Sequence, residues 1–100
     1  MNLEVKVIND NEVVCVLDGT LDTVSSMEFD DELTELAEKY DKITYDCAEL
    51  DYITSAGLRL IAKSLLLLQQ RGGELIMKSV NEEIMAVFKM VAYDKLLKFE

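Results

Sequence analysis

The chain has 100 residues, of which 50% are hydrophobic, and a formal net charge of −10, which suits one small domain spanning residues 1–100. The acidic balance argues against nucleic acid or an anionic membrane as the partner, because either would repel this surface. The longest unbroken apolar run, Leu65–Leu68, is too short to cross a membrane and the amino terminus lacks a signal-peptide pattern, so a cytoplasmic location is expected.

The chain contains two cysteines and no histidine. Cys15 and Cys47 each lie in an apolar, strand-like stretch, which favours buried free thiols over a disulfide or a metal pair. Zinc sites usually combine several cysteines and histidines at short spacing, so neither a metal nor another cofactor is expected. Because histidine is missing, a Ser-His-Asp or Cys-His nucleophile is excluded, and no catalytic residue is expected.

The first predicted elements are two strands and a helix. Residues 3–7 alternate apolar with charged side chains, as in a half-buried strand, and the turn residues at 9–11 lead to a second strand at 13–17. The second run is apolar throughout, which is typical of a strand covered on both faces. The short connection makes the two strands antiparallel. Residues 20–24 are predicted to form a loop, and Ser25-Ser26-Met27-Glu28 matches a capping box that begins the helix.

The second half of the chain alternates strands with helices. The pattern predicts a third strand at 43–47, a loop at 48–54, a long helix at 55–71 stopped by Gly72-Gly73, a fourth strand at 75–77, a third helix capped by Asn81 and a short edge strand at 97–100. Strands joined through helices lie parallel, with right-handed crossovers. The expected fold is therefore an α/β domain with a mixed sheet of four to five strands and three to four helices.

This topology brings two distant segments together. The segments that follow the second and third strands leave the sheet at the same edge, where α/β sheets tend to host ligands. Residues 19–22 are therefore expected beside residues 51–57, and the two segments should form one site.

A hydroxyl begins the long helix within this predicted site. Thr54 or Ser55 is most simply an N-cap. An exposed hydroxyl there can also carry a phosphate without refolding, because the phosphate meets unpaired amides and the positive end of the helix dipole. It would add roughly −1.5 to −2 charge near Asp22 and Asp51, so that docking weakens while the fold survives. Gly57, in the first turn, indicates a close backbone approach by the neighbouring loop or by a partner.

The segment Leu50–Ala62, with Gly19-Thr20-Leu21-Asp22 upstream and the whole element order, resembles a stand-alone STAS domain of the bacterial anti-sigma factor antagonist family. The resemblance implies a domain that binds an anti-sigma factor, a serine protein kinase that supplies ATP and magnesium, and so frees the sigma factor. It also implies that the kinase phosphorylates one serine at the start of the second helix and breaks the complex. A PP2C-type phosphatase then restores the binding form.

Transferred by position, the resemblance places the phosphate acceptor at Ser55 and the family's aspartate at Asp22. The usual Asp-Ser-Ser-Gly or Asp-Ser-Thr-Gly pattern is altered at Thr54 and Ala56, which makes Thr54 a second candidate acceptor. The partner surface around the phosphorylation site is predicted to comprise Gly19, Thr20, Asp22, Asp51, Ala56, Gly57 and Leu58.

The leading hypothesis is a phosphorylation-gated antagonist whose unmodified form alone binds the kinase. The alternative is a non-switching STAS subunit of a transport or stress-sensing assembly, in which Ser55 is only a cap and Leu60, Leu66 and Leu67 widen the contact face of the second helix. Nucleotide binding by the chain itself is disfavoured because no Gly-rich phosphate loop is present. Enzyme activity is the least expected class, although Asp22 and Asp51 could form a carboxylate pair.

Overall fold

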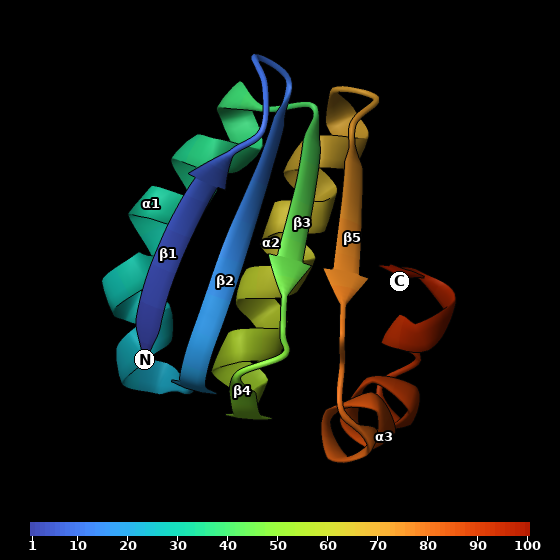
Figure 1. Ribbon diagram of the computed structural model, residues 1–100. Helices are drawn as coiled ribbons and strands as arrows, with labels where there is room; N and C mark the ends of the chain where they lie inside the picture. Colours follow the sequence, from blue (N-terminus) through green and yellow to red (C-terminus); the bar gives the residue numbers. More distant parts are fainter.

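The computed structural model describes all 100 residues as one mixed sheet with two long helices on one face (Figure 1). The elements in chain order are β1 (Asn2–Val7), β2 (Glu12–Leu21), α1 (Thr23–Lys39), β3 (Lys42–Asp46), β4 (Leu50–Ile53), α2 (Ser55–Gln70), β5 (Glu74–Lys78), α3 (Glu82–Met90), a 3₁₀ turn (Tyr93–Lys95) and β6 (Lys98–Phe99). This is the predicted α/β class.

The strands run in the order β1-β2-β3-β5-β6, with β4 paired to the second half of β2. The β1–β2 pair is antiparallel and every other pair is parallel, which confirms the predicted directions. The sheet has six strands rather than four to five. The additional strand, β4, lies where a loop was predicted. Its two outer residues are buried and its two middle ones are exposed, so it lacks the period-two alternation that marks a strand.

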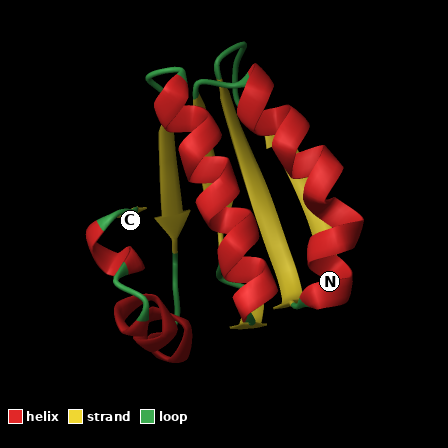
Figure 2. Cartoon of the chain, turned by 180° about the vertical axis from the view of Figure 1, so that it is seen from behind, coloured by secondary structure: helices red, strands yellow, loops and turns green.

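Helices α1 and α2 lie side by side across one face of the sheet (Figure 2), and α3 lies beyond the end of β5. The opposite face carries no helix. Val13, Cys15 and Leu17 are fully buried, whereas Val14 and Val16 are half-buried on the open face. The prediction that this strand is covered on both faces is therefore wrong. Valine occurs on the open face because β-branched side chains suit a pleated, half-buried surface.

Helix α1 begins at Thr23, earlier than the predicted start at Ser25. The capping box consists of Asp22 and Ser25: the Asp22 carboxylate accepts the Ser25 N–H at 2.9 Å, and Ser25 Oγ accepts the Asp22 N–H at 2.8 Å. The predicted box at Ser25–Glu28 is therefore wrong. Aspartate is as good an N-cap as serine, so the sequence allowed both positions.

Two polar links join α2 to α1. At the end of α2, Arg71 Nη1 donates to the Ala37 carbonyl at 2.7 Å, and Arg71 Nη2 pairs with Asp41 at 3.0 Å. Midway along the helices, Lys63 Nζ lies 2.7 Å from Asp30 Oδ1. Polar links therefore hold the two helices together at their C-terminal ends and at their middle.

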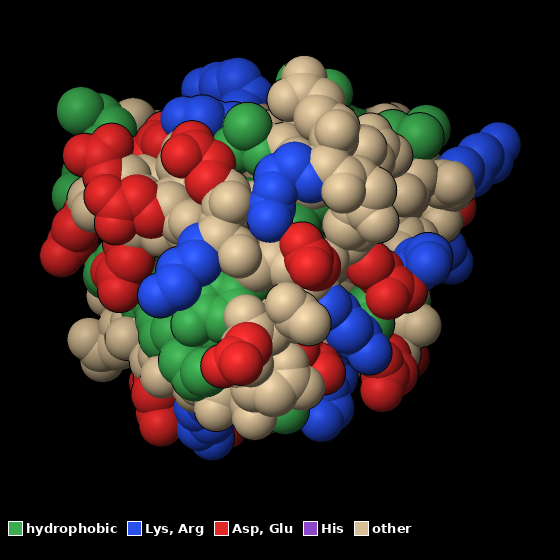
Figure 3. Space-filling model, turned by 90° about the horizontal axis from the view of Figure 1, so that it is seen from above, with side chains coloured by type: hydrophobic (Ala, Val, Ile, Leu, Met, Phe, Trp, Pro, Cys, Tyr) green, Lys and Arg blue, Asp and Glu red, His purple; other side chains and the backbone are tan.

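The C-terminal predictions are confirmed. Gly72 ends α2 with a φ of +73°, Asn81 Oδ1 accepts the Ile84 N–H at 2.8 Å at the start of α3, and β6 pairs with β5 as the edge strand of the sheet. No helix combines the length and the apolar character that a membrane crossing requires. Acidic side chains gather along one side of the end seen in Figure 3; the exposed face of α1 contributes Asp31, Glu32, Glu35 and Glu38 to the acidic surface.

Candidate functional site

The end of β2 and the start of α2 are joined directly. In the β2–β4 ladder Gly19 pairs with Leu50 and Leu21 with Ile53. The Leu21 carbonyl oxygen accepts the Thr54 N–H at 3.0 Å and the Thr54 hydroxyl at 3.3 Å. The two segments that the topology predicted to be neighbours are therefore in contact.

Ser55 is the first residue of α2, and its side chain is exposed. Thr54 occupies the N-cap position, but neither residue caps the helix, because the Thr54 hydroxyl donates to Leu21 instead. The prediction that Thr54 or Ser55 is the N-cap is confirmed in position, at Thr54, although the Thr54 hydroxyl makes no capping hydrogen bond. The backbone N–H groups of Ser55, Ala56 and Gly57 have no acceptor within the chain, whereas α1 and α3 each have a side-chain cap. A helix start of this kind offers its free amides to an anion.

Gly57 allows α2 to approach the sheet. A β-carbon at this position would lie 2.7 Å from the Leu21 carbonyl oxygen and 2.7 Å from Ile53 Cγ1. Of the two explanations for this glycine, the structure confirms close approach by the neighbouring segment of the same chain, the end of β2.

The predicted partner surface is only partly at the surface. Asp51 is exposed, and four residues are half-buried: Gly19, Thr20, Asp22 and Ala56. Gly57 and Leu58 are buried, and Leu58, which is 8% exposed, belongs to the hydrophobic core. The Leu58 side chain therefore packs in the core and presents little surface to a partner. Leu58 lies on the face of α2 that packs against the sheet, so its occurrence in the sequence motif reflects packing.

The carboxylate of Asp22 is a fixed negative charge beside this site. Hydrogen bonds from the backbone amide and the hydroxyl of Ser25 hold the pKa of Asp22 below its usual value. The group is consequently ionised at neutral pH. It caps α1 and also borders the segment that contacts the start of α2.

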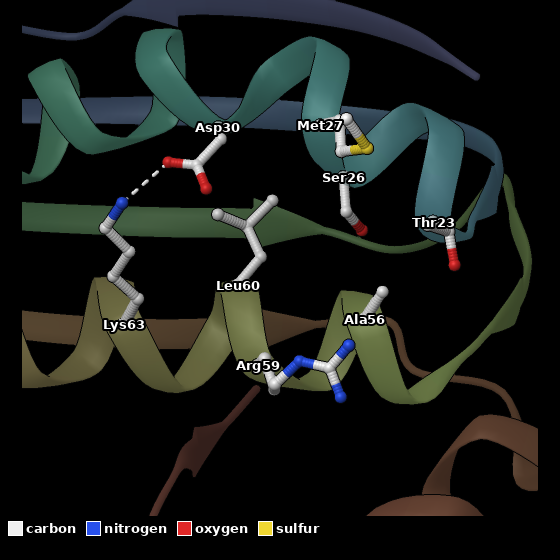
Figure 4. A pocket seen from close by; sticks show the side chains of 8 residues that line it. All are labelled: Thr23, Ser26, Met27, Asp30, Ala56, Arg59, Leu60 and Lys63. Carbon is white, nitrogen blue, oxygen red and sulfur yellow. Dashed lines mark hydrogen bonds and ion pairs between the residues drawn. The ribbon is translucent and has the colours of Figure 1, made fainter.

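A groove of about 360 Å³ separates the first turns of α1 and α2 (Figure 4). It is lined by Thr23, Ser26, Met27, Asp30, Ala56, Arg59, Leu60 and Lys63. Ser26 is buried and its hydroxyl has no hydrogen-bond partner. Arg59 is exposed and belongs to none of the four ion pairs. Arg59 was not predicted from the sequence, although its spacing of four residues from Ser55 is the signal that places both on one helix face.

Comparison with known proteins assigns this architecture to a family. The family model of the STAS domain matches residues 2–100, and the chain belongs to the STAS domain family. Within that class, the chain is 27% identical over 85 residues to BtrV of Bordetella bronchiseptica, whose name describes it as an anti-sigma factor antagonist. The match spans 84% of this chain and 73% of BtrV.

Solved structures share the fold. The anti-sigma factor antagonist SpoIIAA in its unphosphorylated form is similar with a TM-score of 0.76 and 17% identity, over 95% of this chain and 97% of that one. The phosphorylated form from Bacillus gives a TM-score of 0.80 and 16% identity over 99% and 91% of the two chains. TM1081 of Thermotoga maritima gives a TM-score of 0.89 and 22% identity over 97% and 84%.

Proposed function

We propose that this chain is an anti-sigma factor antagonist that binds a serine-kinase anti-sigma factor, releases the sigma factor and is switched off by phosphorylation of Ser55. The observation that carries the proposal is the exposed hydroxyl of Ser55 at an uncapped helix start, beside the end of β2. The family, and the names of BtrV and SpoIIAA, support the same role.

The proposed modification makes this chain a substrate. Ser55 Oγ attacks the γ-phosphorus of ATP, which the kinase holds with magnesium. A new oxygen–phosphorus bond forms, the bond from the γ-phosphorus to the bridging oxygen of ADP breaks, and the serine proton passes to a base of the kinase. A PP2C-type phosphatase reverses the change by hydrolysis, which returns serine and inorganic phosphate.

The added charge acts on docking and leaves the fold intact. The free amides and the dipole at the start of α2 stabilise a phosphate without rearrangement. The same phosphate adds roughly −1.5 to −2 charge to a surface that already carries Asp22 and Asp51. An acidic group of a partner that docks within about 6 Å of this phosphate then meets repulsion of about 1–3 kcal/mol, a loss in affinity of roughly 5- to 150-fold.

The test combines mass spectrometry with calorimetry. After incubation with the kinase partner and Mg-ATP, phosphopeptide analysis should find one phosphoryl group on Ser55 and none in Ser55→Ala. By calorimetry, Ser55→Ala should remain bound when ATP is present, and Ser55→Asp should bind at least about 10-fold more weakly. Gln70→Glu, which adds the same charge at the exposed far end of α2, is the matched control and should bind like wild type. Equal affinities for wild type and Ser55→Asp would discard the switch.

One observation favours the alternative of a non-switching subunit. An apolar groove of about 210 Å³ lies between α2 and the C-terminal segment, where Leu66 is 55% exposed and Leu96 is 59% exposed. The apolar face is narrower than predicted, because Leu60 is buried in the core. In this alternative Leu66→Gln would release the chain from its assembly, while Ser55→Asp would not.

A further inference from the structure

Arg59 lies four residues after Ser55, one turn further along α2. Residues at this spacing share one face of a helix. Both side chains are exposed, and the guanidinium of Arg59 pairs with no carboxylate. In Figure 4 this guanidinium lies beside the first turn of α2, close to Ala56. An unpaired cation therefore stands next to the proposed acceptor.

We propose that Arg59 clamps the phosphoryl group of phospho-Ser55, with the Ser26 hydroxyl as a second donor from α1. The inference rests on the proposed function in one respect, namely that Ser55 is the residue that carries the phosphate. It identifies how the modified state is held and which residues of this chain hold it.

The chemistry of Arg59 suits this role. A guanidinium presents a planar fork of N–H donors that matches two phosphate oxygens at once. The three free amides at the start of α2 supply further donors in the helical turn that precedes Arg59. A phosphate attached at residue 55 is covalently held within reach, so no binding from solution is needed.

Ser26 supplies an independent observation. Its side chain is 7% exposed, and its hydroxyl makes no hydrogen bond. Buried hydroxyls nearly always have a partner. Figure 4 shows this hydroxyl directed from α1 into the groove, toward Ala56. An oxygen of a phosphate at the mouth of the groove would provide the missing acceptor.

The surrounding charges make Arg59 the available cation. Lys63, the other cation of the groove, is bound to Asp30. Arg59 forms no ion pair with Asp22, at the beginning of α1, or with Asp51, which lies on β4 and faces Glu82 and Glu83 of α3. Phosphorylation would thus add negative charge and at the same time occupy the one free cation that the unmodified groove offers to an acidic group of a partner.

The clamp can be tested without the kinase. Phosphoserine is incorporated at position 55 of the full chain by suppression of a stop codon, and the second pKa of the phosphate is followed by phosphorus NMR. In a peptide this pKa is about 6. We expect it to be lower by about one unit in the folded protein, because Arg59 and the helix start stabilise the dianion. Arg59→Gln should raise it by at least about half a unit, and Arg59→Lys should give an intermediate value.

Controls separate the clamp from general effects of charge and from the proposed function. Lys39→Gln removes an exposed cation from the last turn of α1 and should leave the phosphate pKa unchanged. Ser26→Ala should raise it by less than Arg59→Gln does. The same pKa in wild type and Arg59→Gln would overturn the clamp even if the kinase modifies Ser55. A lowered pKa that depends on Arg59 would uphold the clamp even if no kinase modified Ser55.

Discussion

Gly57 and Leu21 meet without room for a side chain between them: a β-carbon on Gly57 would lie 2.7 Å from the Leu21 carbonyl oxygen. The same oxygen accepts the amide and the hydroxyl of Thr54. The Leu21 carbonyl group thus holds the start of α2 against the end of β2, through contacts with both Thr54 and Gly57. The position of Ser55, between these two residues, depends on these contacts.

Gly57→Ala should therefore lower the free energy of unfolding by about 2–3 kcal/mol, because the neighbour that must give way is backbone. The measurement is urea denaturation followed by circular dichroism. Gly72→Ala is the control: it has a φ of +73° with no atom within 4 Å of the added carbon, so only backbone strain of about 1 kcal/mol is expected. A smaller loss for Gly57→Ala than for Gly72→Ala would contradict the close contact.

The hydroxyl of Thr54 should matter for stability rather than for modification. Thr54→Val removes the bond to Leu21 and should cost about 1 kcal/mol in the free energy of unfolding, whereas Thr54→Ser keeps the hydroxyl and most of the stability. Because that hydroxyl is engaged with Leu21, phosphate incorporation by the kinase should be unchanged in Thr54→Val. Phosphate on Thr54 in Ser55→Ala would show that the engagement does not protect it.

The ionised carboxylate of Asp22 should make stability depend on acid. Its pKa is lowered in the folded state by the hydrogen bonds from Ser25. The stability that ionisation contributes is therefore complete above the unfolded pKa, about 3.9, and is lost as the pH falls through the lower pKa of the folded state. Asp22→Asn retains the cap but should lose less stability than wild type between pH 5 and the acid limit, as measured by thermal unfolding at each pH. Parallel profiles would contradict this assignment.

The two thiols should be inert in the folded protein. Burial raises the pKa of Cys15 to about 12 and that of Cys47 to about 12, so almost no thiolate exists at pH 8. A colorimetric thiol reagent at that pH should react only as fast as the chain opens, and both thiols should react at once in urea. The destabilised variant Gly57→Ala should react faster than wild type. Rapid reaction of the native protein would show that a thiol is accessible.

The sequence indicated the elements wherever local pattern and tertiary position agree. The alternation predicted for residues 3–7 holds as far as Lys6, after which Val7 is exposed, and Gly72 ends α2 as the glycine pair predicted. Strand β4 was not predicted, because its two middle residues are exposed while both end residues are buried. It forms a strand through its pairing with β2. The burial of each face of β2 depends on which face of the sheet the helices cover. The residue pattern of one strand does not contain that information.

The candidate site was predictable in position but not in detail. The order of helices and strands along the chain, with the parallel strand directions that it implies, was enough to predict that the end of β2 lies beside the start of α2. The hydroxyl of Thr54 looked like a cap because its competing acceptor, the carbonyl of Leu21, is distant in sequence. Leu58 looked like a contact residue because it belongs to the same short motif, yet the helix turns it into the core.

The links between α1 and α2 are unevenly placed. Arg71 bonds to the end of α1 that is furthest from Ser55, and the Lys63–Asp30 ion pair joins the two helices at their middle. Between the first turns of the two helices there is no side-chain hydrogen bond, and the hydroxyl of Ser26 faces the gap without a partner. Every polar side-chain link between the two helices thus lies in their middle or in the half remote from Ser55. A phosphate at residue 55 would therefore break none of the hydrogen bonds or ion pairs that hold α1 against α2.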